Sequence, residues 1–226
     1  MSQHPLSVLS LLETRVISVL LEKKHTVPDT YPLSLNALVA GCNQKTSRDP
    51  VINASEAEVQ AAIDHLKSLS LVMEVSGNRV TRFEQNIARV LQVPSQSVAI
   101  LTTLMLRGPQ TPGELRINCE RLHKFLDISS VEAFLHELRD RTLGSLVIEL
   151  PRRPGARENR WAHLLSGDVA MDTSSNSQNS SQTGDEVSVG ELAALRANVT
   201  NLENEMATLK AAVSKICSEL GISSTL

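Results

Sequence analysis

Residues 55–83 read SEAEVQAAIDHLKSLSLVMEVSGNRVTRF and combine the pattern of a helix with that of a β-hairpin. Ser55 and Glu58 are spaced as a capping box, which predicts the start of a helix. Residues 71–75 and 79–83 flank a Ser-Gly-Asn turn and predict two paired strands. The apolar residues of the helix recur at the i, i+3, i+4 and i+7 spacing of one face: Val59, Ala62, Ile63 and Leu66.

Two more helices are predicted before this segment. Ser10 and Glu13 form another capping box, and the helix that follows places Lys23 and Lys24 at its negative C-terminal end. A further helix is predicted from about Ser34 to Gly41. Three helices followed by a hairpin is the order of a winged helix, a helix-turn-helix variant whose hairpin forms the wing.

The same order recurs in the second half of the chain. Residues 98–107 predict a helix that ends at a Gly-Pro pair, and residues 111–114 (TPGE) predict the start of the next helix with proline at its first position. Ser129 and Glu132 are spaced as the capping box of a third helix. Two further segments, residues 146–150 and 160–164, predict a second hairpin.

This duplication predicts an α+β, mostly helical fold in four parts. A first winged-helix domain is expected over residues 1–92 and a second over residues 93–167. Residues 168–186 form a Ser/Asn/Gln-rich linker, which we expect to be flexible because it has too few apolar residues to offset the entropy of ordering. Residues 187–226 are expected to form a coiled-coil oligomerisation helix.

The expected oligomerisation helix has apolar residues at alternating steps of three and four. This heptad pattern is typical of a coiled coil and predicts a homodimer. The alternative is a single amphipathic helix packed on the rest of the protein, which usually has a wider apolar face. The heptad residues are Leu192, Leu195, Val199, Leu202, Met206, Leu209, Val213, Ile216 and Leu220.

Composition narrows the possible classes of function. Aromatic residues make up only 2% of the chain, so an extended platform for stacking single-stranded nucleic acid is not expected. The longest apolar run, residues 16–21, is far shorter than a membrane span, and no signal-peptide pattern begins the chain. Three widely separated cysteines (Cys42, Cys119 and Cys217) argue against a disulfide framework. Together these features predict a cytoplasmic protein that does not associate with a membrane.

Motifs for catalysis are not recognisable in the sequence. It has no glycine-rich phosphate loop, no HExxH and no nucleophile elbow. Cys119 and His123 have the i, i+4 spacing of metal ligands on a helix, but two ligands do not make a site and an ordinary helix face is expected. We therefore predict a protein that is not an enzyme and that holds no cofactor or metal.

Two stretches resemble a known family. Residues 26–51, TVPDTYPLSLNALVAGCNQKTSRDPV, are similar to the signature of the bacterial YceH-like family, a group of uncharacterised proteins. Residues 106–114, LRGPQTPGE, are similar to its second hallmark. The resemblance extends over about residues 6–165. It implies a tandem winged-helix protein of unknown biochemical role, with no established catalytic or binding residues to carry over.

The first of these stretches contains a polar loop that could bind a partner. Tyr31 precedes the second helix, and Lys45 and Arg48 follow it in a segment longer than a helix-turn-helix requires. Side chains of this kind bind a phosphate or an acidic partner. The alternative is that the loop has a purely structural role.

Arginines of the two hairpins are the candidate contacts to nucleic acid. The third helices carry more acidic than basic residues, which disfavours their entry into the major groove of DNA. Basic hairpins are able to contact phosphates or enter a minor groove. The alternative for these hairpins is a solvated basic surface that docks on the acidic tail or on another subunit. Two functions follow: a regulatory protein associated with duplex DNA, which the winged-helix order favours, or, as the alternative, an adaptor that binds other proteins. The arginines are Arg79, Arg82, Arg152, Arg153, Arg157 and Arg160.

Overall fold

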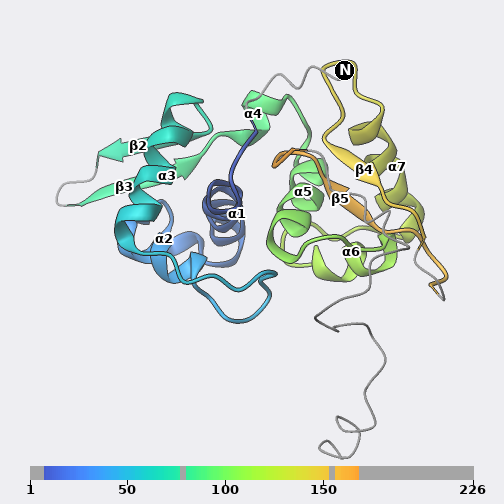
Figure 1. The fold of residues 1–226 in the computed structure, drawn as a ribbon, viewed down its shortest axis with the longest axis horizontal. Coiled ribbons are helices and arrows are strands. Elements are labelled where there is room, and N and C mark those ends of the chain that lie inside the picture. The colour runs from blue at the N-terminus through green and yellow to red at the C-terminus, as the bar shows by residue number, and fades with distance from the viewer. Residues whose placement is uncertain (1–7, 77–79, 153–155, 168–226) are drawn as a thin grey trace, which may run out of the picture. The chain divides into compact units, whose positions relative to one another are not determined.

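Three helices and a β-hairpin occur twice in succession along the chain, and the first helix of each group packs against that of the other (Figure 1). About half of the described residues are helical, so the fold is mixed α+β. None of the described helices is long and apolar enough to cross a membrane. The computed structural model describes residues 8–76, 80–152 and 156–167.

Several predicted features lie outside the described residues. They include the linker at residues 168–186, the coiled-coil helix at residues 187–226 with all its heptad positions, and Cys217. Arg79 and Arg153 also lie outside. The coiled coil and the homodimer therefore stay predictions.

The first half begins with a helix whose start is confirmed. The Ser10 hydroxyl accepts a hydrogen bond from the N–H of Glu13, and the Glu13 carboxylate accepts from the N–H of Ser10. The same reciprocal pair forms between Ser55 and Glu58. The elements of this half are α1 (Leu11–Thr26), η1 (Pro28–Thr30), β1 (Leu33–Ser34), α2 (Leu35–Cys42), α3 (Glu56–Ser68), β2 (Val72–Ser76) and β3 (Thr81–Gln85).

The second half repeats the order with a smaller sheet. Thr111 caps its second helix as predicted, with Pro112 at the first helical position. The prediction that Ser129 caps the third helix is wrong: Asp127 is the cap, and its Oδ1 accepts from the N–H of Ser130 at 2.7 Å. Aspartate is as effective a cap as serine, so the helix starts earlier. The short helix α4 (Ile87–Leu91) links the two halves, and the elements of the second are α5 (Ser95–Arg107), α6 (Pro112–Asn118), α7 (Ile128–Arg139), β4 (Val147–Glu149) and β5 (Trp161–His163).

The sheets of the two halves are built alike. In the first, the order is β1-β3-β2 and all pairs are antiparallel, with Leu33 opposite Phe83. In the second, β4 pairs with β5, and Gln110, just before α6, forms a bridge to Trp161. In both halves, therefore, the backbone before the second helix pairs with the returning strand of the hairpin.

One continuous hydrophobic core extends through both halves. Buried side chains of α1, including Ile17 and Leu20, belong to the same cluster as Leu101 and Leu104 of α5. The backbone also links the two ends of the described chain, because the N–H of Leu9 donates to the carbonyl oxygen of Leu165 at 2.9 Å. The boundary predicted near residue 92 therefore coincides with no break in the core.

His163 on β5 gives the second half a pH-dependent stability. Burial lowers the pKa of its imidazole to about 4, from 6.5 for an unperturbed histidine. As the pH falls from 6.5 toward 4, the imidazole becomes protonated in the unfolded chain but stays largely neutral in the folded protein. Folding stability is therefore expected to fall over this window by about 3 kcal/mol. His163→Leu should flatten the change in melting temperature between pH 7 and pH 4, whereas an unchanged slope would contradict this role.

Candidate functional site

The polar loop of the first signature is anchored by two buried arginines. Arg48 donates from Nη1 and Nη2 to both carboxylate oxygens of Glu22, at 3.2 and 2.5 Å. Arg15, fully buried on α1, donates to the carbonyl oxygens of Cys42 at 3.3 Å and Pro50 at 2.7 Å. These bonds fix both ends of the loop against α1.

The three residues proposed for partner binding in this loop have different environments. Arg48 is only 6% exposed and forms an ion pair with Glu22. This environment favours a structural role for Arg48 over contact with a partner. Tyr31 is half-buried, its hydroxyl accepts from the N–H of Gln85 at 3.0 Å, and burial raises its pKa. Lys45 is exposed. A partner-binding role for this loop stays a prediction, and Lys45 is the residue of the three best placed for it.

The two signature stretches meet in space. The N–H of Asp49 donates to the carbonyl oxygen of Leu106 at 2.8 Å, and Arg107 Nη2 donates to Ser47 Oγ at 2.9 Å. A polar hollow of about 370 Å³ lies at this junction. Arginine and carboxylate side chains both line it, so its charge is mixed. The charged lining residues are Arg48, Asp49, Arg107, Glu114 and Arg160.

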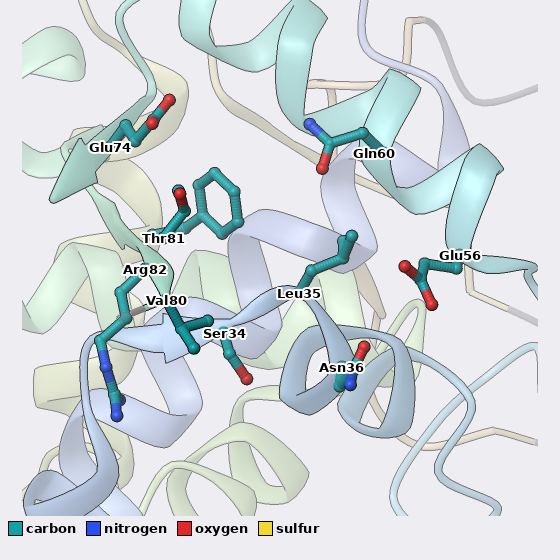
Figure 2. A pocket seen from close by; sticks show the side chains of 10 residues that line it. Ser34, Leu35, Asn36, Glu56, Gln60, Glu74, Val80, Thr81 and Arg82 are labelled. Atoms are coloured by element: carbon teal, nitrogen blue, oxygen red, sulfur yellow. The ribbon is translucent and has the colours of Figure 1, made fainter. Parts of the chain in front are cut away.

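A second, larger hollow of about 520 Å³ lies in the first half between α2, α3 and the hairpin (Figure 2). Leu35 and Phe83 contribute apolar surface to it. Glu56 from α3 and Glu74 from β2 lie on opposite sides of the hollow (Figure 2). Arg82 also lines the hollow and Lys67 forms an ion pair with Glu74, so the charge around it is mixed.

The hairpin arginines belong to two different environments. Arg82 on β3 is exposed, but its Nη1 donates to the carbonyl oxygens of Thr30 at 3.1 Å and Pro32 at 2.7 Å, which ties it to the loop before α2. In the second hairpin, Arg152 and Arg157 are exposed and Arg160 is half-buried beside the junction hollow. Of the described hairpin arginines, only those of the second half lie together.

The outer faces of both third helices are rich in carboxylates. On α3, Glu56, Glu58 and Asp64 are exposed, and on α7, Glu132 and Glu137 are exposed. The sequence already indicated this acidic balance, and the structure places these carboxylates on the solvent side of each helix.

Both described cysteines are core residues. Burial raises the pKa of the Cys42 thiol to about 12 and that of Cys119 to about 11, so both thiols are protonated at neutral pH. Cys119 Sγ lies 3.1 Å from Thr103 Oγ1, whereas the His123 ring packs edge-on against Phe125. Within the described residues, no three His, Cys, Asp or Glu side chains converge as metal ligands.

Reasoning from the sequence missed the junction hollow. The hollow is lined by Asp49 together with Arg107, Glu114 and Asn118. These three residues lie more than 50 positions after Asp49 in the chain. Their joint position depends on how α1 packs against α5, which no local pattern reports. The one available signal was that both family-like stretches end in polar residues, at residues 43–50 and residues 110–114.

Comparisons with known proteins place the chain among uncharacterised bacterial proteins. A family described as "Protein of unknown function, DUF480" matches residues 9–156. A UPF0502 protein of Dechloromonas aromatica is 61% identical over 203 residues, covering 90% of this chain and 93% of the relative. One from Cupriavidus metallidurans is 58% identical and covers 98% of this chain and 90% of the relative. One from Burkholderia cenocepacia is 59% identical, with 95% and 90% covered.

Proposed function

The chain belongs to the DUF480 family of uncharacterised bacterial proteins, and we propose that it is a non-catalytic adaptor that binds other proteins through two winged-helix domains. The family descriptions name no activity or partner. The proposal therefore rests on this chain's own residues.

The winged-helix assignment is supported by the repeated order of elements. Each half has three helices and then a hairpin, and each second helix follows a segment that pairs with the returning strand. This is the arrangement of a helix-turn-helix with a wing. The heptad residues from Leu192 to Leu220 support pairing of two copies through a coiled coil.

The observation that carries the adaptor function is the acidic surface beside α3. In a DNA-binding winged helix, the third helix usually enters the major groove. Here Glu56, Glu58 and Asp64 occupy that surface, and Glu56 with Glu74 also borders the hollow in Figure 2. Carboxylates facing phosphates oppose binding to DNA. Arg82, the nearest described wing arginine, is tied to backbone carbonyls. Such a mixed, hollowed surface suits a protein partner better.

Photo-crosslinking in the cells that make the protein tests this function. A photoreactive residue placed at Glu56 or at Glu132 of the full chain is expected to form adducts that proteases destroy and nucleases leave intact. The yield should exceed that from exposed Arg89 on α4, which serves as the control. If both positions give only nuclease-sensitive adducts, or no more adduct than Arg89, the adaptor function is wrong.

DNA association is the second candidate, and the second hairpin favours it. Arg152 and Arg157 are exposed there, and Arg160 lies close by. If a mixed-sequence duplex binds the full chain at low salt, changing these three and Arg153 to alanine should flatten the slope of log affinity against log salt by roughly 2–4, at about 0.9 per lost phosphate contact. Sequence preference should change less, because backbone contacts position a protein without specifying bases.

A further inference from the structure

Charged side chains of both signs line the junction hollow, the polar hollow where the two signature stretches meet, and most of them are unpaired. Arg48 is the exception, because it forms an ion pair with Glu22 of α1. The others form no ion pair with each other or with any other described residue. Since opposite charges within one hollow of about 370 Å³ attract each other, the fold must hold them apart. These side chains are Asp49, Arg107, Glu114 and Arg160.

Local hydrogen bonds keep Arg107 and Glu114 from pairing. Arg107 Nη2 donates to Ser47 Oγ at 2.9 Å, which directs the guanidinium toward the loop of the first half. One carboxylate oxygen of Glu114 accepts from the N–H of Thr111 at 2.8 Å, as part of the capping box of α6. A guanidinium has five N–H donors and a carboxylate has two oxygens, so both groups keep further capacity to bind a ligand.

The walls of the junction hollow are tied together by a buried glutamine. Gln110 is 5% exposed, and its Nε2 donates to the carbonyl oxygens of Thr103 and Gly108, each at 3.2 Å. Its Oε1 accepts from Asn118 Nδ2 at 2.6 Å, and its backbone forms the bridge to Trp161. These bonds fix α5, α6 and β5 around the hollow, and a largely pre-formed lining of this kind is typical of a small-molecule site.

Size and charge together define the ligand that the hollow fits. Its volume lies near the lower end of the range for small-molecule sites, and Pro109 is the one apolar residue of its lining. The two arginines and two carboxylates balance, and exposed Arg157 and Glu158, which lie just before Arg160 in the chain, add one charge of each sign. This balance disfavours a ligand with a net charge. A small polar molecule that carries both charges satisfies both kinds of group.

We propose that the junction hollow binds a free amino acid in its zwitterionic form. Arg107 and Arg160 hold the carboxylate of the ligand, and Asp49, with the second oxygen of Glu114, holds its ammonium group. Each of these contacts is a charge-assisted hydrogen bond, which is about twice as strong as a neutral one. The bound amino acid lies against both signature stretches, so it stabilises their packing on each other. This site goes beyond the adaptor function and does not depend on it.

Thermal unfolding of the full chain with each of the common free amino acids, at equal concentration, identifies the probe. The amino acid that raises the melting temperature most is then titrated by calorimetry beside two of its derivatives. The N-acetyl derivative lacks the ammonium group, and the amide lacks the carboxylate. Each derivative is expected to bind at least about tenfold more weakly, because charges of one sign in the hollow stay unpaired. The proposal is overturned if no amino acid raises the melting temperature, or if either derivative binds as tightly as the amino acid.

Two substitutions test which side chain holds each end of the ligand. Asp49→Asn should weaken binding of the amino acid by about tenfold but leave binding of its N-acetyl derivative unchanged, because only the ammonium contact is lost. Arg160→Gln should likewise weaken the amino acid and spare the amide. Asp29→Asn and Arg89→Gln are the matched controls, since both side chains are exposed and lie outside the hollow. Variants that behave like these controls, or that weaken all three ligands equally, would show that the hollow does not hold the zwitterion.

Discussion

Replacing Arg48 with methionine is expected to lower the free energy of unfolding by about 3 kcal/mol, because it breaks a buried ion pair. The Arg48 side chain is fully buried and the Glu22 side chain is 17% exposed. Without the guanidinium, the Glu22 carboxylate loses two hydrogen bonds and the carbonyl oxygen of Gly41 loses another. Lys23 Nζ lies 3.5 Å from the Glu22 carboxylate and partly compensates its charge. The loss of stability is therefore expected near the lower end of the range for a broken buried ion pair.

Urea unfolding followed by circular dichroism measures this cost. Lys45→Met provides the matched control, because Lys45 belongs to the same loop but is exposed, and its replacement should change stability by no more than about 0.5 kcal/mol. Glu22→Gln in the Arg48→Met background should recover part of the loss, since it removes the uncompensated charge. Equal effects of Arg48→Met and Lys45→Met would contradict the anchoring role.

The secondary structure of this chain follows from local chemistry, and that is why the sequence predicts it well. A capping box spans four residues, so Ser10, Ser55 and Thr111 are recognisable without any tertiary information. The error at α7 has the same local origin. Asp127 and Ser129 are both good caps two residues apart, and the choice between them depends on the path of the α6–α7 loop.

The sequence does not predict which distant segments of the chain pair with each other. The strand β1 has only two residues, too few for an alternating pattern to be recognised, although it completes the first sheet. The sequence likewise does not decide the role of Arg48, because a basic residue in a polar loop is compatible with a surface contact and with a buried ion pair. Arg48 pairs with Glu22 because α1, which carries Glu22, packs against this loop.

The candidate surfaces illustrate the same limit for function. The acidic surface of the third helices is predictable from the sequence, because charged residues are expected to be exposed in any fold. The exposure of Ile117 and Ile128 is not predictable, since an apolar residue in a helix is expected to face the core. Only the packing of α6 and α7 in the folded protein shows that these two side chains face solvent.

Gly41 is expected to be the least replaceable position of α2. A Cβ built there would lie 2.5 Å from Cγ1 of Val19 on α1, closer than such atoms approach in folded proteins. Val19 is completely buried, and a valine side chain in a helix has essentially one rotamer, so it has no way to turn aside. The two helices must separate instead. Because α1 also packs against α3 and α5, that separation disturbs the centre of the core.

Gly41→Val is therefore expected to destabilise the protein by about 3 kcal/mol through overpacking. Ala40→Val is the matched control: the same side chain enters the neighbouring position of the same helix, but Ala40 is exposed, and only about 0.5 kcal/mol of helix propensity is lost. Val19→Ala should recover at least about 1 kcal/mol in the Gly41→Val background, because the new methyl groups then fill the space left by the old ones. Thermal unfolding of the three variants and of the unchanged protein measures these differences. A Gly41→Val protein as stable as Ala40→Val would show that α1 and α2 have room between them, and would refute the close packing inferred for this pair.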